Sequence, residues 1–328
     1  MSLNRREFLT LSGATLVGLP FTSTLLSGCG SIGGGGCENS MEFMNNTSFM
    51  PGSPWGMVVQ LSGNDRPAFQ RVGELGVQWA RISASWNQIE AVDGRFDWSA
   101  VDFHLNELRR VGVDIFFATL AYAPPWACAS GSGQTCVPRE DAWVRFVSAF
   151  ARNYRGKIQY LGMWNEPNLS GFWGGSLDQY RDLILIPGAV AARAANPNVI
   201  VVGGEFSGLR LETGDITSVL QNGGIDALDV LTVHDYHGAD GAACKTGMAA
   251  QALREVGGPT LGGKMIWLTE FDSRDIGSVA PWAAAHNVPI APFQIWNPGN
   301  PSEEYNMLNQ DYSPKPSWTN YFNIIHGG

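Results

Sequence analysis

The feature that most constrains the fold of this chain is an alternation of short apolar runs with longer amphipathic segments. Apolar runs of this length are typical of strands that are buried on both faces of a parallel sheet. The segments between them, such as residues 100–112 and 141–154, repeat apolar side chains every three or four positions and predict helices. The runs occupy residues 55–61, 77–83, 114–120, 160–166, 199–205, 229–236, 264–271 and 290–297.

Eight predicted strands that alternate with helices define the fold class. Over about 250 residues, this is the count expected for a (β/α)8 barrel, the α/β fold also called a TIM barrel. A doubly wound open sheet has the same alternation and is the structural alternative. Its dinucleotide-binding version carries a glycine-rich fingerprint after the first strand, and no such motif follows residues 55–61. We therefore predict a single (β/α)8 domain over residues 51–328.

The N-terminus has the features of an export signal. Arg5 and Arg6 precede the apolar run 9–26, which is too short and too interrupted for a comfortable transmembrane helix. The arrangement resembles a twin-arginine signal over residues 1–28, and "LSGC" resembles a bacterial lipobox in which Cys29 carries the lipid. Residues 29–50 then form a glycine-rich tether and a lead-in to the barrel. A plain cleaved secretory signal is the alternative.

Charge and cysteine usage narrow the partners. The formal net charge is −9, and lysine and arginine do not cluster beyond the N-terminus, which argues against nucleic acid as a partner. Export permits disulfides, and we expect Cys128 and Cys136 to bridge the short glycine-rich loop between them. The sequence leaves open whether Cys37 and Cys244 pair or stay free.

The sequence does not predict a metal site. It contains no CxxC motif and no cysteine–histidine spacing typical of zinc. His234 and His237 could form a pair of ligands, but Asp235 and Glu270 do not complete a known metal-binding spacing. We therefore expect a protein that works without metal or cofactor. We also expect it to be a monomer.

Polar side chains gather where the predicted strands end. In a (β/α)8 barrel the residues that do chemistry lie at the carboxyl ends of the strands, so these side chains should meet at one mouth. The residues concerned are Arg81, Ser83, Asn165, Glu166, Glu205, His234, Asp235, Tyr236, Glu270, Trp296 and Asn297. Among them, Glu205 either lines the site or caps a helix.

Two of these residues, Glu166 and Glu270, form a predicted carboxylate pair. They end the fourth and seventh strands, three strand–helix units of about 35 residues apart. In a closed ring of eight strands these two positions lie nearly opposite each other, so both carboxylates point into the central mouth. Two carboxylates across a cleft are the equipment of glycoside hydrolysis, in which one group donates a proton and the other attacks.

The motifs around this pair resemble those of a known group of enzymes. "WNEPN" at 164–168, followed by "LTEF" at 268–271, resembles the retaining glycoside hydrolases of clan A, and glycoside hydrolase family 39 is the most similar. The resemblance extends to "WARISASWNQIEAVDGRFDWSAVD" at 79–102 and "AYAPPW" at 121–126. With "HDYH" at 234–237, it covers nearly the whole predicted mature chain.

The resemblance assigns roles to the residues of the predicted mouth. Glu166 corresponds to the general acid/base and Glu270 to the nucleophile. Asn165 corresponds to the residue that hydrogen-bonds the sugar 2-hydroxyl, a contact that strengthens in the transition state. Arg81 and Tyr236 correspond to the pair that keeps the nucleophile ionised and oriented.

Aromatic residues are the expected sugar contacts. The resemblance implies that Trp296 forms the floor of the subsite where the bond breaks and that His234 lines the same site. Trp126, Phe172 and Trp173 follow predicted strand ends and are candidate stacking platforms, with ordinary core packing as the alternative.

These observations predict a retaining glycosidase that acts on a polysaccharide or oligosaccharide. The chain carries the barrel without the accessory β-domain that many family 39 xylosidases append, which favours an open groove and cleavage within a chain. The predicted anchor on Cys29 places the enzyme in the periplasm or at the cell surface. A non-hydrolytic carbohydrate-binding lipoprotein and an exo-acting β-xylosidase or β-glucosidase are the alternatives.

Overall fold

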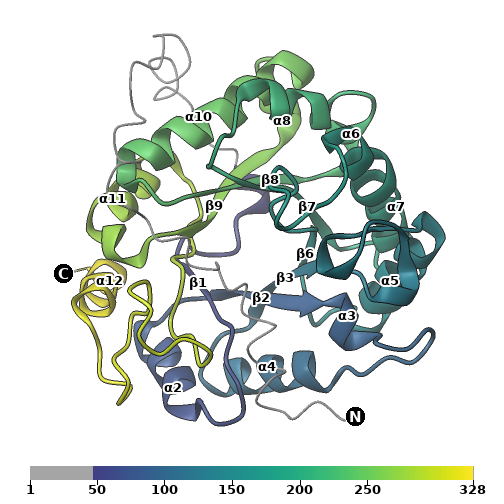
Figure 1. Cartoon of the computed structure of the whole chain (residues 1–328). Helices are drawn as coiled ribbons and strands as arrows, with labels where there is room; N and C mark the ends of the chain where they lie inside the picture. The colour runs from purple at the N-terminus through teal and green to yellow at the C-terminus, as the bar shows by residue number, and fades with distance from the viewer. Residues whose placement is uncertain (1–46, 328) are drawn as a thin grey trace, which may run out of the picture.

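The computed structural model describes residues 47–327, which form a (β/α)8 barrel as predicted (Figure 1). Seven of its parallel strands follow each other around one sheet in the order β1-β2-β3-β6-β7-β8-β9. Their side chains are almost all buried, because helices cover the outer face and neighbouring strands fill the inner one. The strands are β1 (Gly56–Val58), β2 (Trp79–Ser85), β3 (Ile115–Ala121), β6 (Tyr160–Met163), β7 (Ile200–Ser207), β8 (Val230–Asp235) and β9 (Met265–Phe271).

The predicted eighth strand, residues 290–297, differs from the sequence prediction. It makes isolated parallel bridges instead of a regular strand, with Ile290 between Trp55 on one side and Leu268 on the other. The amides of Gly56 and Ala291 still donate across the two seams, to the carbonyls of Ile290 and Leu268 respectively. Pro289 and Pro292 lack amide hydrogens, which explains why the ladder is interrupted. The segment nevertheless closes the barrel.

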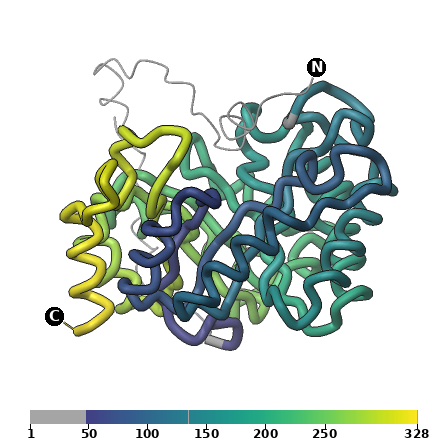
Figure 2. The backbone as a smooth tube through the Cα atoms, turned by 90° about the horizontal axis from the view of Figure 1, so that it is seen from below, coloured from purple at the N-terminus to yellow at the C-terminus, as the bar shows by residue number. Residues whose placement is uncertain are grey.

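Helices surround the barrel as an outer ring (Figure 1). Seen from the side, the coils of α12 in yellow and α2 in purple-blue lie next to each other (Figure 2). The last helix, α12, contacts both α11 and α2, so the ends of the described chain complete the ring. The α-helices are α2 (Arg66–Leu75), α3 (Trp86–Ile89), α4 (Ser99–Arg110), α5 (Glu140–Asn153), α6 (Leu177–Tyr180), α7 (Ile186–Ala195), α8 (Thr213–Leu220), α9 (Gly224–Ala227), α10 (Gly238–Gly257), α11 (Ile276–His286) and α12 (Pro316–Ile325).

Helix α5 illustrates why the sequence forms these helices. Its apolar side chains recur every three or four residues, and Trp143, Phe146 and Phe150 are fully buried against the barrel. Two acidic residues lie in its first turn and Arg152 in its last, which suits the helix dipole. The helix predicted over 141–154 is therefore confirmed within one residue at each end.

The floor of the barrel is a separate apolar cluster. Trp79, Trp267 and Tyr160 pack together inside the ring, with ring centroids about 5 Å apart. The lead-in before β1 packs on the same cluster, and the Tyr160 hydroxyl donates to the carbonyl of Phe49 at 3.1 Å. The interior is therefore solid at this end, and chemistry is confined to the opposite mouth.

The loop after β3 carries a small hairpin made of β4 (Cys128–Ser130) and β5 (Val137–Pro138). The predicted disulfide between Cys128 and Cys136 is present, with Cα atoms 5.7 Å apart. The carbonyl of Thr135 accepts from the amide of Gly174 at 2.7 Å, so the hairpin loop is hydrogen-bonded to the loop that follows β6.

The predicted export signal and anchor, with Arg5, Arg6, Cys29 and the glycine-rich tether, lie outside the described residues. Cys37, which the sequence leaves either paired with Cys244 or free, lies outside them too. Across residues 47–327, no helix combines the length and the apolar character needed to cross a membrane.

Candidate active site

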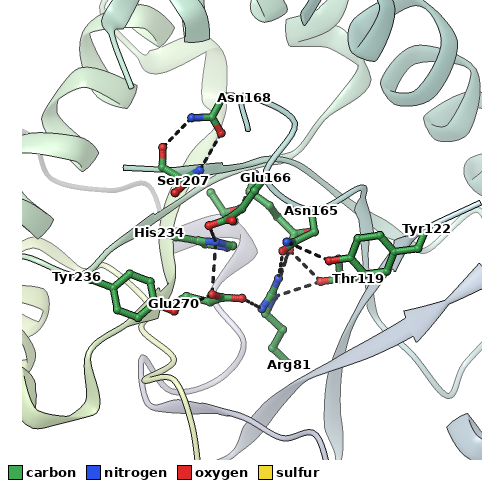
Figure 3. Close-up of polar contacts among 12 residues, drawn as sticks. Arg81, Thr119, Tyr122, Asn165, Glu166, Asn168, Ser207, His234, Tyr236 and Glu270 are labelled. Carbon is green, nitrogen blue, oxygen red and sulfur yellow. Dashed lines mark hydrogen bonds and ion pairs between the residues drawn. The ribbon is translucent and has the colours of Figure 1, made fainter. Parts of the chain in front are cut away.

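The two predicted glutamates meet at the mouth of the barrel (Figure 3). Glu166 is the third residue after the end of β6, and Glu270 is the last residue but one of β9. One oxygen from each carboxylate and one nitrogen of His234 all lie within 4.8 Å of one another. Retaining glycosidases hold their carboxyl groups about 5–5.5 Å apart, whereas inverting enzymes leave about 6.5–9.5 Å for a water molecule. The spacing therefore suits direct attack by one of the carboxylates.

Arg81 is the central donor of the site. From β2 it donates to Glu270 Oε1, to Asn165 Oδ1 at 2.8 Å and to Glu205 Oε2 at 2.6 Å. Its Nε also donates to the hydroxyl of Thr119 on β3. Burial alone would lower the pKa of Arg81, but the two carboxylates raise it overall, so the guanidinium stays charged.

Glu270 has the surroundings of an ionised nucleophile. Besides Arg81, the Tyr236 hydroxyl donates to its Oε2 at 2.9 Å, and His234 Nδ1 lies 3.6 Å from the same oxygen. Burial raises the pKa of Glu270, but His234, Arg81 and Tyr236 outweigh it and hold the pKa below the usual range of a glutamate.

Glu166 contacts a different set of groups. Its Oε1 is 3.0 Å from His234 Nδ1, and its backbone amide donates to the carbonyl of Glu205 at 3.0 Å. Two residues later, Asn168 exchanges two hydrogen bonds with the backbone of Ser207 on β7. The loop that carries Glu166 is therefore fixed to the neighbouring strand, as Figure 3 shows.

Backbone geometry re-aims several of these side chains. The pairing of β7 with β8 shifts register between Gly203 and Phe206, and that of β8 with β9 shifts between Val233 and His234. Such irregularities turn a side chain relative to its strand, and here they occur at Glu205 and just before Glu270. Glu205 itself has a φ of 45°.

Further positive-φ residues follow the neighbouring strands. Tyr122, Trp164 and Glu166 have φ values of 66°, 81° and 44°. Each such residue costs about 1–3 kcal/mol, and this strain persists only where surrounding contacts enforce it. The concentration of strained residues at one mouth marks it as the functional end of the barrel.

Three residues of this network received no definite role in the sequence analysis. Glu205 lines the site rather than capping a helix, because its side chain is fully buried against Arg81. Thr119 lies inside an apolar run and is the only residue with a hydroxyl group among residues 114–120, so the sequence pattern did not single it out. Tyr122 lies within the quoted "AYAPPW" motif, and its hydroxyl accepts from Asn165 Nδ2 at 3.3 Å.

The predicted aromatic sugar contacts need correction. Trp173 is only 1% exposed and packs on Trp164 and Tyr180, so it belongs to the core and is not a stacking platform. Trp296 is 3% exposed and packs on Tyr312, so its ring lies beneath the surface instead of forming an open floor.

The loops after β3 and β6 hold the remaining aromatic candidates. Trp126 is half-buried, with the Arg145 guanidinium 5.2 Å from the ring centroid, and its indole donates to the carbonyl of Glu90. Phe172 is half-buried too, and its carbonyl accepts from the Trp164 indole. Of the four aromatic candidates, these two retain exposed area at the surface.

Glu166, His234 and Glu270 also satisfy the ligand spacing of a metal site. Two features argue against that use. Arg81 already occupies one oxygen of Glu270 with a positive charge, and a metal ion beside it would be repelled. His237, the second histidine considered as a possible ligand, is largely exposed and hydrogen-bonded to Asp235.

A cavity of about 340 Å³ lies beside the loop that follows Glu166. Eight residues between Pro167 and Leu177 line it together with Asp215, and none of the side chains of the carboxylate network contributes to it. It therefore adjoins the loop that follows Glu166 and lies apart from the carboxylate network.

Comparisons with known proteins agree with this fold. The glycoside hydrolase family 42 model, described as beta-galactosidase, matches residues 65–136. A family 39 glycoside hydrolase from Bacteroides cellulosilyticus superimposes with a TM-score of 0.62 at 16% identity, covering 82% of this chain and 62% of that one. A monomeric beta-xylosidase from Caulobacter crescentus gives 0.67 at 18% identity, covering 83% and 67%.

A xylanase from Thermotoga maritima gives a TM-score of 0.58 at 12% identity, covering 89% of this chain and 97% of that one. No curated protein matches the sequence. Identities this low establish the fold alone, and the chain spans 62% of the length of the Bacteroides structure. The predicted (β/α)8 barrel is thus confirmed, and the family 39 structures and the family 42 model to which the chain is similar agree with the clan A resemblance of its motifs.

Proposed function

We propose that this protein is a retaining glycoside hydrolase that cleaves O-glycosidic bonds of a polysaccharide or oligosaccharide. The observation that carries the proposal is that Glu166 and Glu270 lie close together but have different hydrogen-bond partners. One carboxylate is bound by Arg81 and Tyr236, and the other contacts His234. Two like groups in unlike surroundings can take opposite roles as acid and nucleophile. The similarity to family 39 and family 42 glycoside hydrolases supports this proposal.

In the first step, Glu270 attacks the anomeric carbon while the bond to the leaving oxygen breaks. Glu166 donates its proton to that oxygen, so the leaving sugar departs as a neutral alcohol. Arg81 and Tyr236 keep the attacking oxygen ionised and oriented until the ester forms.

In the second step, the Glu166 carboxylate takes a proton from water, and the water oxygen attacks the anomeric carbon. The ester bond to Glu270 breaks, and its electron pair returns to the carboxylate that Arg81 stabilises. Two inversions at one carbon give net retention of the anomeric configuration.

Proton NMR of the first-formed product tests the proposal directly. The starting anomer should appear first and then mutarotate. Inverted product, or undiminished activity in the Glu270→Gln variant, contradicts it. A protein that binds polysaccharide without releasing any product supports the alternative of a carbohydrate-binding lipoprotein.

We also propose that the enzyme cleaves within polysaccharide chains. The xylanase from Thermotoga maritima, almost all of which this chain covers, supports that mode, whereas the Caulobacter beta-xylosidase supports removal of terminal sugars. Product mapping over a polysaccharide panel separates the two. Early release of mixed oligosaccharides supports internal cleavage, and early release of monosaccharide alone contradicts it.

The cell envelope is the proposed location. The sequence motif "LSGC" supports lipidation of Cys29, and the paired arginines before it support twin-arginine export. In a detergent-partition assay, Cys29→Ser should move the protein from the detergent phase to the aqueous phase. Unchanged partitioning contradicts the anchor.

A further inference from the structure

Glu205 is a third carboxylate in the site, and the mechanism above gives it no task. Its side chain is fully buried in the barrel interior. One oxygen, Oε2, accepts from Arg81 Nη2 at 2.6 Å, Arg81 Nε at 3.1 Å and the Thr119 hydroxyl at 2.8 Å. The other oxygen, Oε1, has no hydrogen-bond partner among the described residues. The hydrogen bonds of the Glu205 side chain therefore all come from Arg81 or from the hydroxyl beside it.

The barrel is built to admit this carboxylate. A Cβ added to Gly162 would lie 2.0 Å from Glu205 Oε1, so only glycine leaves room for it on β6. The register shift in β7, with Gly204 at a φ of 85°, turns Glu205 inward. A buried charge is costly unless it is paired, and an apolar side chain would stabilise this position more simply. Retention of a charge here points to a role in the site.

Arg81 is thereby shared between two carboxylates. Glu205 engages Nε and Nη2 from within the barrel, and Nη1 is left to bind Glu270 at the mouth. We propose that Glu205 is a positioning residue that aims Arg81 at Glu270 and, by taking part of its charge, sets how strongly Glu270 is held as an anion. This inference rests on the proposed function, in which Glu270 is the nucleophile.

The surrounding charges support this role. Burial raises the pKa of Glu205 above its usual range despite Arg81, whereas the pKa of Glu270 is held below its range. One guanidinium therefore stands between two carboxyl groups whose pKa values are displaced in opposite directions. The other titratable groups that face the two carboxylates are Tyr122, Glu166, Tyr180, His234 and Tyr236.

The Glu205→Gln variant tests the inference, because it removes the charge and keeps the shape. Without the competing anion, Arg81 acts on Glu270 alone. The acid-side limb of the kcat/KM profile should then move about one pH unit lower. We expect kcat to fall roughly tenfold or more while KM changes little, since Arg81 is less firmly aimed.

Glu90→Gln is the matched control. Glu90 is equally buried and pairs with Arg145 and the Trp86 indole, but it lies outside the carboxylate network. Its replacement should lower stability without moving the pH limb. If Glu205→Gln does not fold, Thr119→Val removes one donor to Glu205 and should shift the limb in the same direction by a smaller amount.

Titration of the Glu270 carboxyl by 13C NMR separates the two proposals, because it does not require turnover. A lower midpoint in Glu205→Gln, with the wild-type midpoint retained in Glu90→Gln, supports the positioning role. A folded Glu205→Gln variant with an unchanged midpoint and pH limb overturns it. A wild-type protein without glycosidase activity overturns the proposed function instead, and the titration still decides the role of Glu205.

Discussion

Arg81 and Asn165 are joined by a hydrogen bond of 2.8 Å from the guanidinium to the side-chain oxygen of the asparagine. This bond determines which way the amide faces. With Oδ1 turned to Arg81, the Nδ2 group points to the Tyr122 hydroxyl at 3.3 Å and is presented as a donor. A sugar hydroxyl beside Asn165 would therefore meet a donor whose orientation is already set.

Asn165→Asp should lower kcat/KM by about 100-fold to 1,000-fold. The carboxylate can still accept from Arg81 but cannot donate to the 2-hydroxyl, a contact worth several kcal/mol in the transition state. The check is a comparison of sugar and 2-deoxy substrates. The variant should lose little with the 2-deoxy substrate, and an equal loss with both would show that Asn165 acts elsewhere.

Glu166→Ala should separate the two chemical steps. Hydrolysis of substrates with poor leaving groups should fall by about 10³-fold, because nothing protonates the departing oxygen. Activated aryl glycosides need no proton and should still load Glu270. Added azide should then accelerate turnover and give a glycosyl azide with the starting configuration, as read by NMR. A glycosyl azide of opposite configuration would show that azide replaces the nucleophile, so that Glu166 and not Glu270 has that role.

Tyr236→Phe should move the acid-side limb of kcat/KM about one pH unit higher. The lost hydroxyl donates to Glu270 and is one of the groups that depress its pKa. A depressed pKa contributes stability above the unfolded-state pKa, and that stability is lost as pH falls through the folded-state value. The variant should therefore begin to lose stability at a higher pH on the acid side. Tyr305→Phe, which keeps the ring packed on Tyr236, is the control and should match wild type.

Gly162→Ala should destabilise the fold by about 1–3 kcal/mol, because its Cβ collides with Glu205 Oε1. Urea unfolding measures the loss. Adding Glu205→Ala should recover part of it, with a coupling of about 1 kcal/mol or more in the double-mutant cycle. Gly171→Ala, at a position with open space around it, should be nearly neutral. Strict additivity of the first two changes would mean that the two residues do not share that space.

The Cys128–Cys136 disulfide should contribute at most about 2–3 kcal/mol to the free energy of unfolding, as expected for so short a loop. Replacing both cysteines with serine and measuring urea unfolding tests the size. A larger loss would imply that the hairpin also supports the loop after β6 through the Thr135–Gly174 hydrogen bond.

The sequence predicted the barrel and the meeting of Glu166 and Glu270 because both depend on regular patterns. Strand ends in a parallel barrel share one mouth, so the positions of Glu166 and Glu270 in the apolar runs were enough to bring them together. The same reasoning could not assign Glu205 securely. Its inward direction depends on a local register shift beside Gly204, which breaks the alternation of side chains along a strand.

Aromatic residues were assigned less well because residue type does not reveal burial. Trp173 follows the acid-bearing loop, as a sugar platform would, yet its ring fills the space between Trp164 and Tyr180. The prediction of a regular eighth strand was wrong for a simpler reason. Pro289 and Pro292 interrupt the hydrogen-bond ladder that the apolar pattern alone suggests.

The contacts of Arg81 have a consequence for when the proposed activity can arise. A residue from the second strand is bonded to partners on β3, β7 and β9 and to Asn165 after β6. No half of the barrel contains this set, because Arg81 belongs to the first half and Glu270 to the second. The network around Arg81 therefore forms only when the barrel has closed, and we expect a partly folded chain to lack the proposed activity.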